Sequence, residues 1–227
     1  MPSLTARLYR IQRTWTVPDL TGNRQGDVWR NAAPLSVDYF CPESSSHRPV
    51  TGCKLLYDQA ALYGLFRVED RYVRAVSTAF QSDVYRDSCV ELFLEPVSGG
   101  GYFNFEFNCA GALLASYVTD PTRVNGRVAS CVALSPEDDA AIARVSSLPG
   151  VIDPEISAPT AWSLAFALPF SILKKYSPRA SAAPGSVWRG NFYKCGDATS
   201  HPHWASWSPL TERNFHLPEC FGKLIFQ

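Results

Sequence analysis

The sequence predicts an all-β protein folded as one β-sandwich, mostly antiparallel and of the immunoglobulin-like or jelly-roll-like kind, over residues 1–227. Two observations carry this prediction. Apolar side chains alternate with other residues in several short segments, which is the period of a half-buried strand. Glycine and proline turn signals separate these segments, and no domain boundary, repeat or low-complexity tract interrupts them. A chain of 227 residues can bury a core without disulfides or metals.

Four segments alternate clearly enough to be assigned as strands, namely residues 61–68, 89–95, 102–108 and 162–168. In the third segment, three phenylalanines share one face, while polar residues and a tyrosine share the other. We expect each of the four to form a strand that is buried on one face only. Weaker strand candidates are residues 35–40, 54–57, 113–118, 127–134, 187–194 and 223–226.

Turn and helix signals divide these segments. Three consecutive glycines at 99–101 predict a hairpin that joins the second clear strand segment to the third. Helical signal is limited to one or two short turns, one at 169–173 with Ser171 near its cap and one at 135–143. The other turn signals are Asn125-Gly126, Pro149-Gly150 and Pro184-Gly185.

Charge and composition exclude two classes of partner. Lys plus Arg is 21 and Asp plus Glu is 21, so the formal net charge is zero. A neutral chain lacks the basic surface that binds nucleic acid or an anionic membrane, and we expect neither partner. Aromatic residues make up 13% of the chain, which suits both a β core and surfaces that stack on a ligand.

The seven cysteines are odd in number, scattered along the chain and without any CxxC pair. We expect seven free thiols in a reducing compartment and no zinc site built on close thiol pairs. The first 14 residues lack the unbroken apolar stretch of a signal peptide, and no run reaches transmembrane length. These features predict a soluble, cytoplasmic protein, or a secreted one if the sequence is a piece of a longer precursor.

The most informative pattern begins just before the second clear strand segment. Tyr85 ends a polar loop, and Glu91 points away from the apolar face of its strand. If the next strand pairs with it as a hairpin, Asn104, Glu106 and Asn108 lie on the same surface. An aromatic ring beside carboxylates and amides suits a sugar, because the ring stacks on the pyranose C–H face while the polar groups bind hydroxyls.

A second informative segment, residues 214–226, places an aromatic residue and a histidine in a loop that runs through Pro and Gly into a final strand. Together with three earlier segments, it resembles the family 9 carbohydrate-binding modules, in which similar motifs follow one another in the same order. The resemblance spans most of the chain, from about residue 20 to residue 226. The segments that carry it are Asp-Val-Trp-Arg-Asn-Ala at 27–32, Tyr-Arg-Asp-Ser-Cys-Val-Glu-Leu-Phe-Leu at 85–94, the amphipathic strand with Pro-Phe-Ser at 162–171, and the closing segment at 215–226.

The resemblance implies a β-sandwich that binds a sugar without acting on it, in carbohydrate catabolism and often attached to a glycoside hydrolase. In such modules two aromatic residues clamp a terminal sugar, and the matching positions here are Tyr85 and Phe215. A glutamate that binds the sugar matches Glu91, and an asparagine on the following strand matches Asn108. We therefore expect the two rings to face each other across a surface slot, with Glu91 and Asn108 at its base.

Two departures from the family pattern bear on this site. Studied members commonly carry Trp in the clamp, so the Tyr and Phe of this chain should stack more weakly. Glu106 stands where such members carry an arginine, so a donor is lost and a different preferred sugar or binding mode is allowed. Glu106 and Tyr193 complete the predicted site.

Some members of the family also hold structural calcium. This chain lacks a dense run of Asp and Asn residues, and we expect no cofactor and no other metal.

Each of these residues also has an ordinary structural interpretation. Tyr85 alone would be a rim aromatic, and Phe215 would fasten its loop to the core. Glu91 and Glu106 would form a solvated strand face. The loop at 201–207 holds two histidines, which without a third ligand usually form a polar loop rather than a metal site, and two tryptophans, of which at least one is expected in the core.

These residues are compatible with three functions. The predicted function is non-catalytic binding of a mono- or oligosaccharide. One alternative is a glycoside hydrolase that uses Glu91 and Glu106 as its carboxylate pair. The other is a haem-binding relative of the cellobiose-oxidising cytochrome domains; Met1 is the only methionine, so ligation would fall to His203 and His216.

Overall fold

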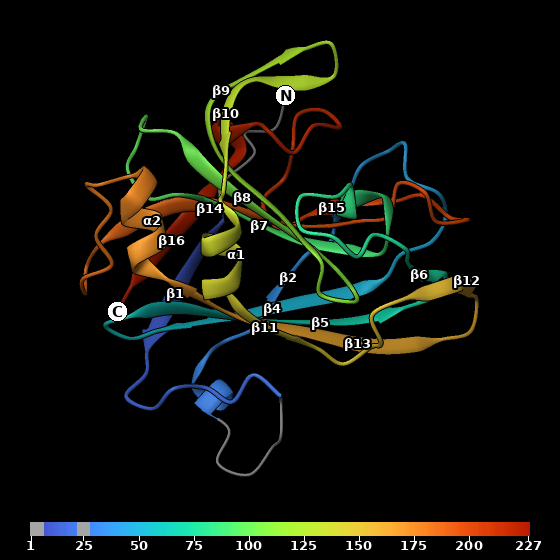
Figure 1. The fold of residues 1–227 in the computed structure, drawn as a ribbon, viewed down its shortest axis with the longest axis horizontal. Helices are drawn as coiled ribbons and strands as arrows, with labels where there is room; N and C mark the ends of the chain where they lie inside the picture. The colour runs from blue at the N-terminus through green and yellow to red at the C-terminus, as the bar shows by residue number, and fades with distance from the viewer. Residues whose placement is uncertain (1–6, 22–27) are drawn as a thin grey trace.

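Two layers of β-sheet pack face to face in the computed structural model, which describes residues 7–21 and 28–227 (Figure 1). The first layer contains β3 (Tyr39–Phe40), β7 (Cys89–Glu95), β8 (Tyr102–Asn108), β9 (Leu113–Val124), β10 (Arg127–Ala133), β14 (Val187–Cys195), β15 (Trp204–Ser206) and β16 (Gly222–Phe226). The second layer contains β2 (Leu35–Ser36), β4 (Val50–Tyr57), β5 (Ala61–Asp70), β11 (Ala143–Ser146) and β13 (Thr160–Pro169). A separate pair is formed by β6 (Val73–Ala75) and β12 (Ile152–Ile156). The predicted all-β sandwich is confirmed.

Strand β1 (Leu8–Arg13) joins the two layers. Its first part pairs in parallel with β16, and its last two residues, Gln12 and Arg13, pair in parallel with β4. The strand order across both layers is β10-β9-β8-β7-β14-β16-β1-β4-β5-β13-β11, and the other pairings along it are antiparallel. A sheet that folds over along one strand covers its own apolar face, so the two layers share one core.

The core between the layers follows the predicted alternation. Phe103, Phe105 and Phe107 of β8 are all at most 1% exposed and lie in the main apolar cluster. Phe107 stacks on Phe166 of β13, with ring centroids 5.2 Å apart. Gly64 faces the Phe166 ring so closely that a Cβ there would lie 2.1 Å from its Cζ atom. The glycine in the β5 pattern is thus required by packing.

The opposite face of β7 and β8 is buried as well, which the expectation of half-buried strands did not foresee. Every residue of both strands is buried. A second apolar cluster covers this face and contains Phe93, Tyr102, Val118, Tyr193 and Phe221. The hairpin of β9 and β10, which rises above the first layer (Figure 1), and the loop at 210–221 supply its cover. Glu91 and Glu106 therefore do not lie on a solvated face.

The predicted connections are largely present. The glycine turn joins β7 to β8 as an antiparallel hairpin, and Asn125 and Gly126, with φ of 50° and 79°, turn β9 into β10. Helix α1 (Pro136–Ala141) begins with a capping box on Ser135. Helix α2 (Phe170–Tyr176) follows β13 directly, and its N-cap is Pro169, two residues before the expected position near Ser171.

The sequence pattern did not predict five of the strands, namely β1, β6, β11, β12 and β15. Most of them are short or carry charged residues, so their alternation is weak. Predicted strand 35–40 is split into β2 and β3, which pair with different layers. Of the opening motif, Trp29 is buried within the 3-10 helix Val28–Asn31, while Asp27 lies outside the described residues, as does Met1.

All seven cysteines are free in the structure. Five are buried, Cys220 is half-buried, and Cys131 on β10 is exposed. Over residues 7–21 and 28–227, the helices are too short or too polar to cross a membrane.

A buried network of charges ties the two layers together. Lys194 of β14 occupies a core-facing position and is fully buried. Its Nζ lies 3.3 Å from an Asp70 carboxylate oxygen on β5 and donates to His203 Nε2 at 2.8 Å. The second Asp70 oxygen lies 2.7 Å from His47 Nε2, and the Trp162 indole donates to Asp70 at 3.3 Å. The histidine loop therefore belongs to this network.

Burial, with the Lys194 charge beside it, lowers the pKa of His203 from 6.5 to about 3. Between these values the unfolded chain binds a proton at this histidine and the folded chain does not. Stability from this residue is therefore lost as the pH falls from 6.5 toward 3. The variant His203→Gln lacks this titration, and its amide oxygen still accepts from Lys194. From pH 7 to pH 4.5, we expect the free energy of unfolding of wild type to fall by about 2–3 kcal/mol relative to that of the variant.

Urea unfolding of both proteins at the two pH values measures this difference. The comparison with the variant is needed because burial raises the pKa of Glu91 and of Glu106, which shifts stability in the opposite direction over the same range. An equal change in unfolding free energy for the two proteins would show that His203 is not the source.

Candidate binding site

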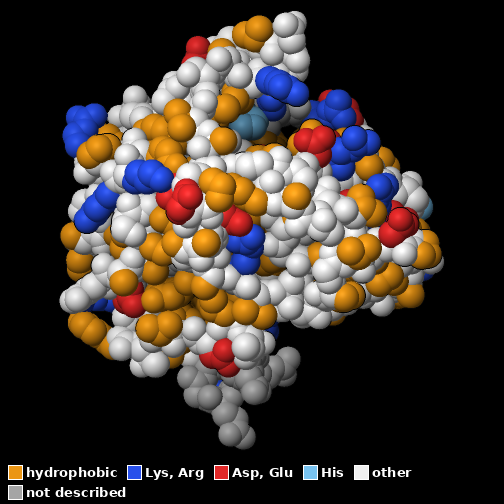
Figure 2. Space-filling model, in the orientation of Figure 1, with side chains coloured by type: hydrophobic (Ala, Val, Ile, Leu, Met, Phe, Trp, Pro, Cys, Tyr) orange, Lys and Arg blue, Asp and Glu red, His pale blue; other side chains and the backbone are white. Residues whose placement is uncertain are grey.

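A pocket with a volume of about 630 Å³ opens on the outer face of the first layer, within the size range of small-molecule sites. Its floor is the second face of β7, β8, β9 and β14. Its walls come from the loop before β7, the loop between β14 and β15, residues 213–216 and the β9–β10 hairpin. Figure 2 views the sandwich from the side and shows basic and acidic side chains beside a hollow below the β9–β10 hairpin.

Two carboxyl groups lie in the floor of the pocket. Glu91 of β7 and Glu106 of β8 are cross-strand partners, and they are only 2% and 6% exposed. Asn104 donates to Glu106 at 2.8 Å and accepts from the Ser116 backbone N–H at 3.0 Å, so the Glu106 side chain is held in place. Adjacent strands thus fix both carboxyls on one rigid surface.

Burial sets the protonation of this floor. It raises the pKa of Glu106 to about 7. It raises the pKa of Glu91 well above its usual value, and the Cys195 thiol and Glu106 nearby add to the rise. The only hydrogen-bond donors to Glu91 among the described residues are weak ones, the thiol of Cys195 at 3.1 Å and that of Cys89 at 4.0 Å. A carboxyl that keeps its proton can both donate to and accept from a hydroxyl.

Aromatic side chains form the upper wall. Tyr85, Trp204 and Phe215 all line the pocket, and each is half-buried. The Trp204 indole donates to Asp197 at 2.7 Å, and the Arg213 guanidinium lies 4.4 Å from the centre of its ring. Half-exposed rings held by such contacts offer a π-face to a ligand without having to be ordered first.

The comparison with protein families settles the relationship. The family model described as Carbohydrate-binding family 9 matches residues 29–226, nearly the whole chain.

The chain belongs to carbohydrate-binding family 9. It is a carbohydrate-binding protein, as the four sequence segments predicted.

Solved structures agree with this assignment. A candidate carbohydrate-binding protein of Bacteroides uniformis is 28% identical, with a TM-score of 0.80 over 98% of this chain and 100% of that one. A family 9 module of Caldicellulosiruptor kristjanssonii in complex with glucose shares the fold at 15% identity, with a TM-score of 0.62 over 97% and 96% of the two chains. The cellotriose complex of a family 9 module from the same organism is 16% identical, with a TM-score of 0.59 over 97% of this chain and 94% of that one. No curated protein matches this chain.

Of the residues predicted for the site in this family 9 module, Tyr85, Glu91, Glu106 and Phe215 all line the pocket. Tyr193 lies beneath it instead. Its ring is fully buried and stacks on Phe215 at 4.1 Å, and its hydroxyl donates to the Phe215 carbonyl at 2.9 Å. Tyr193 therefore positions one wall aromatic and does not itself face the pocket.

Asn108 lies outside the pocket, contrary to its expected place at the base of the slot. Its side chain is fully buried. The amide nitrogen donates to the Ser77 carbonyl at 2.8 Å and to Asp87 at 3.0 Å. The amide oxygen accepts from the backbone N–H groups of Ala110 and Ala112. Because the turn after β8 uses this hydrogen-bonding capacity, the residue is structural.

The predicted site left out several residues that line the pocket. Asn104 was expected on the same strand face as Glu106 but was not assigned to the site, and it lines the pocket. Trp204 lines the pocket while Trp207 is 3% exposed in the core, as expected for one rim and one core tryptophan. Arg123 and Asp197 come from a hairpin and a loop whose positions no local pattern indicated.

The histidines are committed to other contacts. His203 uses both ring nitrogens, with Lys194 and with the His201 carbonyl at 2.9 Å. His216 Nδ1 bonds the Tyr102 hydroxyl at 2.6 Å, and burial lowers the pKa of this histidine to about 3. Nothing in these contacts favours haem ligation. Among the described residues, one group has metal-ligand spacing, Cys89, Glu91 and Cys195; its thiols do not suit calcium, which prefers oxygen ligands.

Proposed function

We propose that the pocket of this family 9 protein binds a mono- or oligosaccharide, with one sugar ring between the Tyr85 and Phe215 side chains. The observation that carries this proposal is the combination of half-buried aromatics above two buried carboxyls in one pocket. The rings supply stacking on pyranose C–H faces, and Glu91 and Glu106 bind hydroxyls. The glucose and cellotriose complexes of the Caldicellulosiruptor module make glucose and cellooligosaccharides the first ligands to test.

We propose further that binding occurs without catalysis. Glycosidases place two carboxyls on either side of the scissile bond, about 5–10 Å apart. Here Glu91 and Glu106 are register partners on neighbouring strands and belong to the same floor. A sugar above this floor would meet both carboxyls from one side. The arrangement supports recognition of hydroxyls, because the two glutamates do not stand opposite each other across the sugar.

The aromatic wall gives a direct test. We expect Tyr85→Ala and Phe215→Ala each to weaken binding of glucose or cellotriose about tenfold, since a stacked ring contributes on the order of 1–2 kcal/mol. Isothermal titration calorimetry measures the affinity, and circular dichroism measures the melting temperature. The matched control is Trp15→Ala, which removes an aromatic that is 83% exposed and outside the pocket.

The control is expected to bind like wild type. Equal affinity for wild type and both pocket variants would contradict the clamp. A lower melting temperature with unchanged affinity would mean that the two rings only pack their loops.

A further inference from the structure

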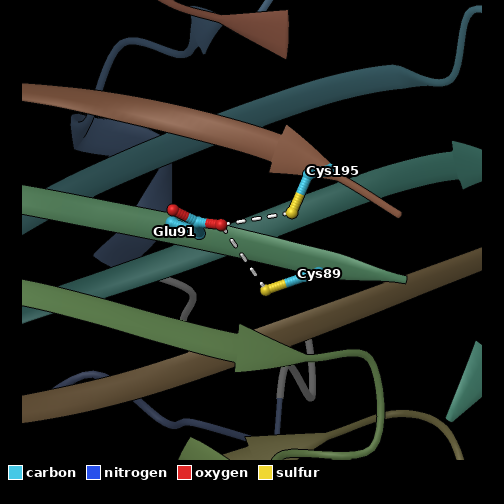
Figure 3. A group of neighbouring side chains, drawn as sticks. All are labelled: Cys89, Glu91 and Cys195. Carbon is cyan, nitrogen blue, oxygen red and sulfur yellow. Dashed lines mark hydrogen bonds between the residues drawn. The ribbon is translucent and has the colours of Figure 1, made fainter. Parts of the chain in front are cut away.

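Three potential metal ligands meet beside the floor of the pocket, and Figure 3 shows how their side chains point toward one another. Cys89 and Glu91 are two residues apart on β7, so they share a face, and Cys195 of β14 is the cross-strand partner of Cys89. Cys195 Sγ lies 3.1 Å from Glu91 Oε1, and Cys89 Sγ lies 4.0 Å from it. All three ligand atoms lie within 4.8 Å of one another, and all three residues are buried.

These separations suit a tetrahedral soft cation. In such a complex Zn–S bonds of about 2.3 Å and a Zn–O bond of about 2.1 Å place the ligand atoms roughly 3.6–3.8 Å apart. The observed spacing needs only small side-chain adjustments to reach this geometry. Two thiolates would neutralise a divalent cation, and the Glu91 carboxylate would leave the filled site with one net negative charge beside the open pocket.

The Glu91 carboxyl has only weak hydrogen-bond partners among the described residues. It is 2% exposed, and among the described residues its hydrogen-bond partners are the two thiols. A buried carboxyl is normally paired with a cation or with strong donors. Glu91 and Cys195 also line the pocket, so a fourth coordination position would face a space that water can fill.

We propose that Cys89, Glu91 and Cys195 form a binding site for a thiophilic divalent cation such as Zn²⁺, with the fourth ligand position open to the pocket. Each thiol releases its proton when its sulfur binds the metal, and Glu91 releases its proton when its carboxylate does. The proposal goes beyond sugar binding. It also predicts competition, because a metal-bound Glu91 is no longer free to bind a hydroxyl.

Cadmium is the probe for this site, because thiolate-to-Cd²⁺ charge transfer absorbs in the ultraviolet. The titration uses reduced full-length protein with Cys131→Ser and Cys220→Ser, which removes the two thiols that are not buried. We expect the absorption to saturate at one equivalent of Cd²⁺, and Zn²⁺ to reverse it. Adding Cys89→Ala or Cys195→Ala should abolish the one-equivalent saturation. The matched control is Cys53→Ala, which removes a thiol that is buried on β4, and it should leave the titration unchanged.

Glu91→Gln provides a test that keeps both thiols. Because the amide has the same shape and is a poorer ligand, we expect Cd²⁺ affinity to fall about tenfold or more while the charge-transfer band remains. Saturation that persists without Cys195, or that is lost equally in Cys53→Ala, would overturn the site. So would a Glu91→Gln variant with wild-type Cd²⁺ affinity. No sugar is present in these titrations, so their outcome is independent of the carbohydrate experiments.

Discussion

Lys194→Met is expected to lower the free energy of unfolding by about 3–5 kcal/mol, because removing one partner of a buried ion pair leaves the other charge uncompensated. Lys194 and Asp70 both have fully buried side chains and link β14 to β5 across the core. Interaction with the Lys194 charge and the hydrogen bond from His47 hold the pKa of Asp70 below its usual range, against the effect of burial. Without its lysine, Asp70 must either stay buried as a charge with only hydrogen-bond partners beside it or take up a proton, and both outcomes cost free energy. Urea unfolding at pH 7 measures the loss.

The control for this prediction is a lysine with a similar contact at the surface. Lys175 Nζ lies 2.9 Å from Asp138, but the lysine side chain is 52% exposed. Solvent screens such a pair, so Lys175→Met should cost less than about 1 kcal/mol. Combining Lys194→Met with Asp70→Asn should lower the free energy of unfolding by less than the sum of the single changes, since the double variant has no unpaired carboxylate at position 70. Similar losses for the two lysine variants would show that burial does not strengthen the Lys194 pair.

Glu91→Gln is expected to weaken glucose or cellotriose binding about ten- to hundredfold, the effect of losing a buried hydrogen bond to a ligand. Stability should stay the same or rise at pH 7. Within residues 7–21 and 28–227, the buried carboxyl has only thiols as donors, so the fold must either keep it protonated or bury its charge. An amide avoids that cost. Calorimetry gives the affinity, and urea unfolding gives the stability.

Glu95 on the same face of β7 offers a matched control with the opposite expected signature. Its carboxylate pairs with Arg189 at 2.9 Å and accepts from the Gly99 N–H at 2.9 Å. It does not line the pocket. Glu95→Gln should leave sugar affinity unchanged and lower stability by about 1 kcal/mol. Unchanged affinity in Glu91→Gln would remove this residue from the proposed sugar site.

Local sequence patterns predicted the main strands because side-chain period and burial are coupled within a few residues. The alternation in β8 placed its three phenylalanines in the core, and the triple glycine placed the β7–β8 turn. Short strands such as β6 and β15 were not predicted, since three residues are too few to display a period. Their positions depend on the strands beside them.

The candidate site was predictable only in part. The alternation and the family segments identified Tyr85, Glu91, Glu106 and Phe215, which line one pocket although they come from distant parts of the chain. The same reasoning placed Asn108 in the site, because a side chain's face can be read from its strand but its hydrogen-bond partners cannot. Those partners belong to the following turn and to Asp87.

The sequence by itself determined the β-sandwich, the face of each main strand that enters the core, and membership of carbohydrate-binding family 9. These properties depend on local periodicity and on the order of motifs along the chain. Only the tertiary structure decided that the second face of β7 and β8 is covered, that Lys194 meets Asp70, and that Cys89 lies beside Cys195. Such contacts join residues far apart in sequence, so they exist only once strand order and register are fixed.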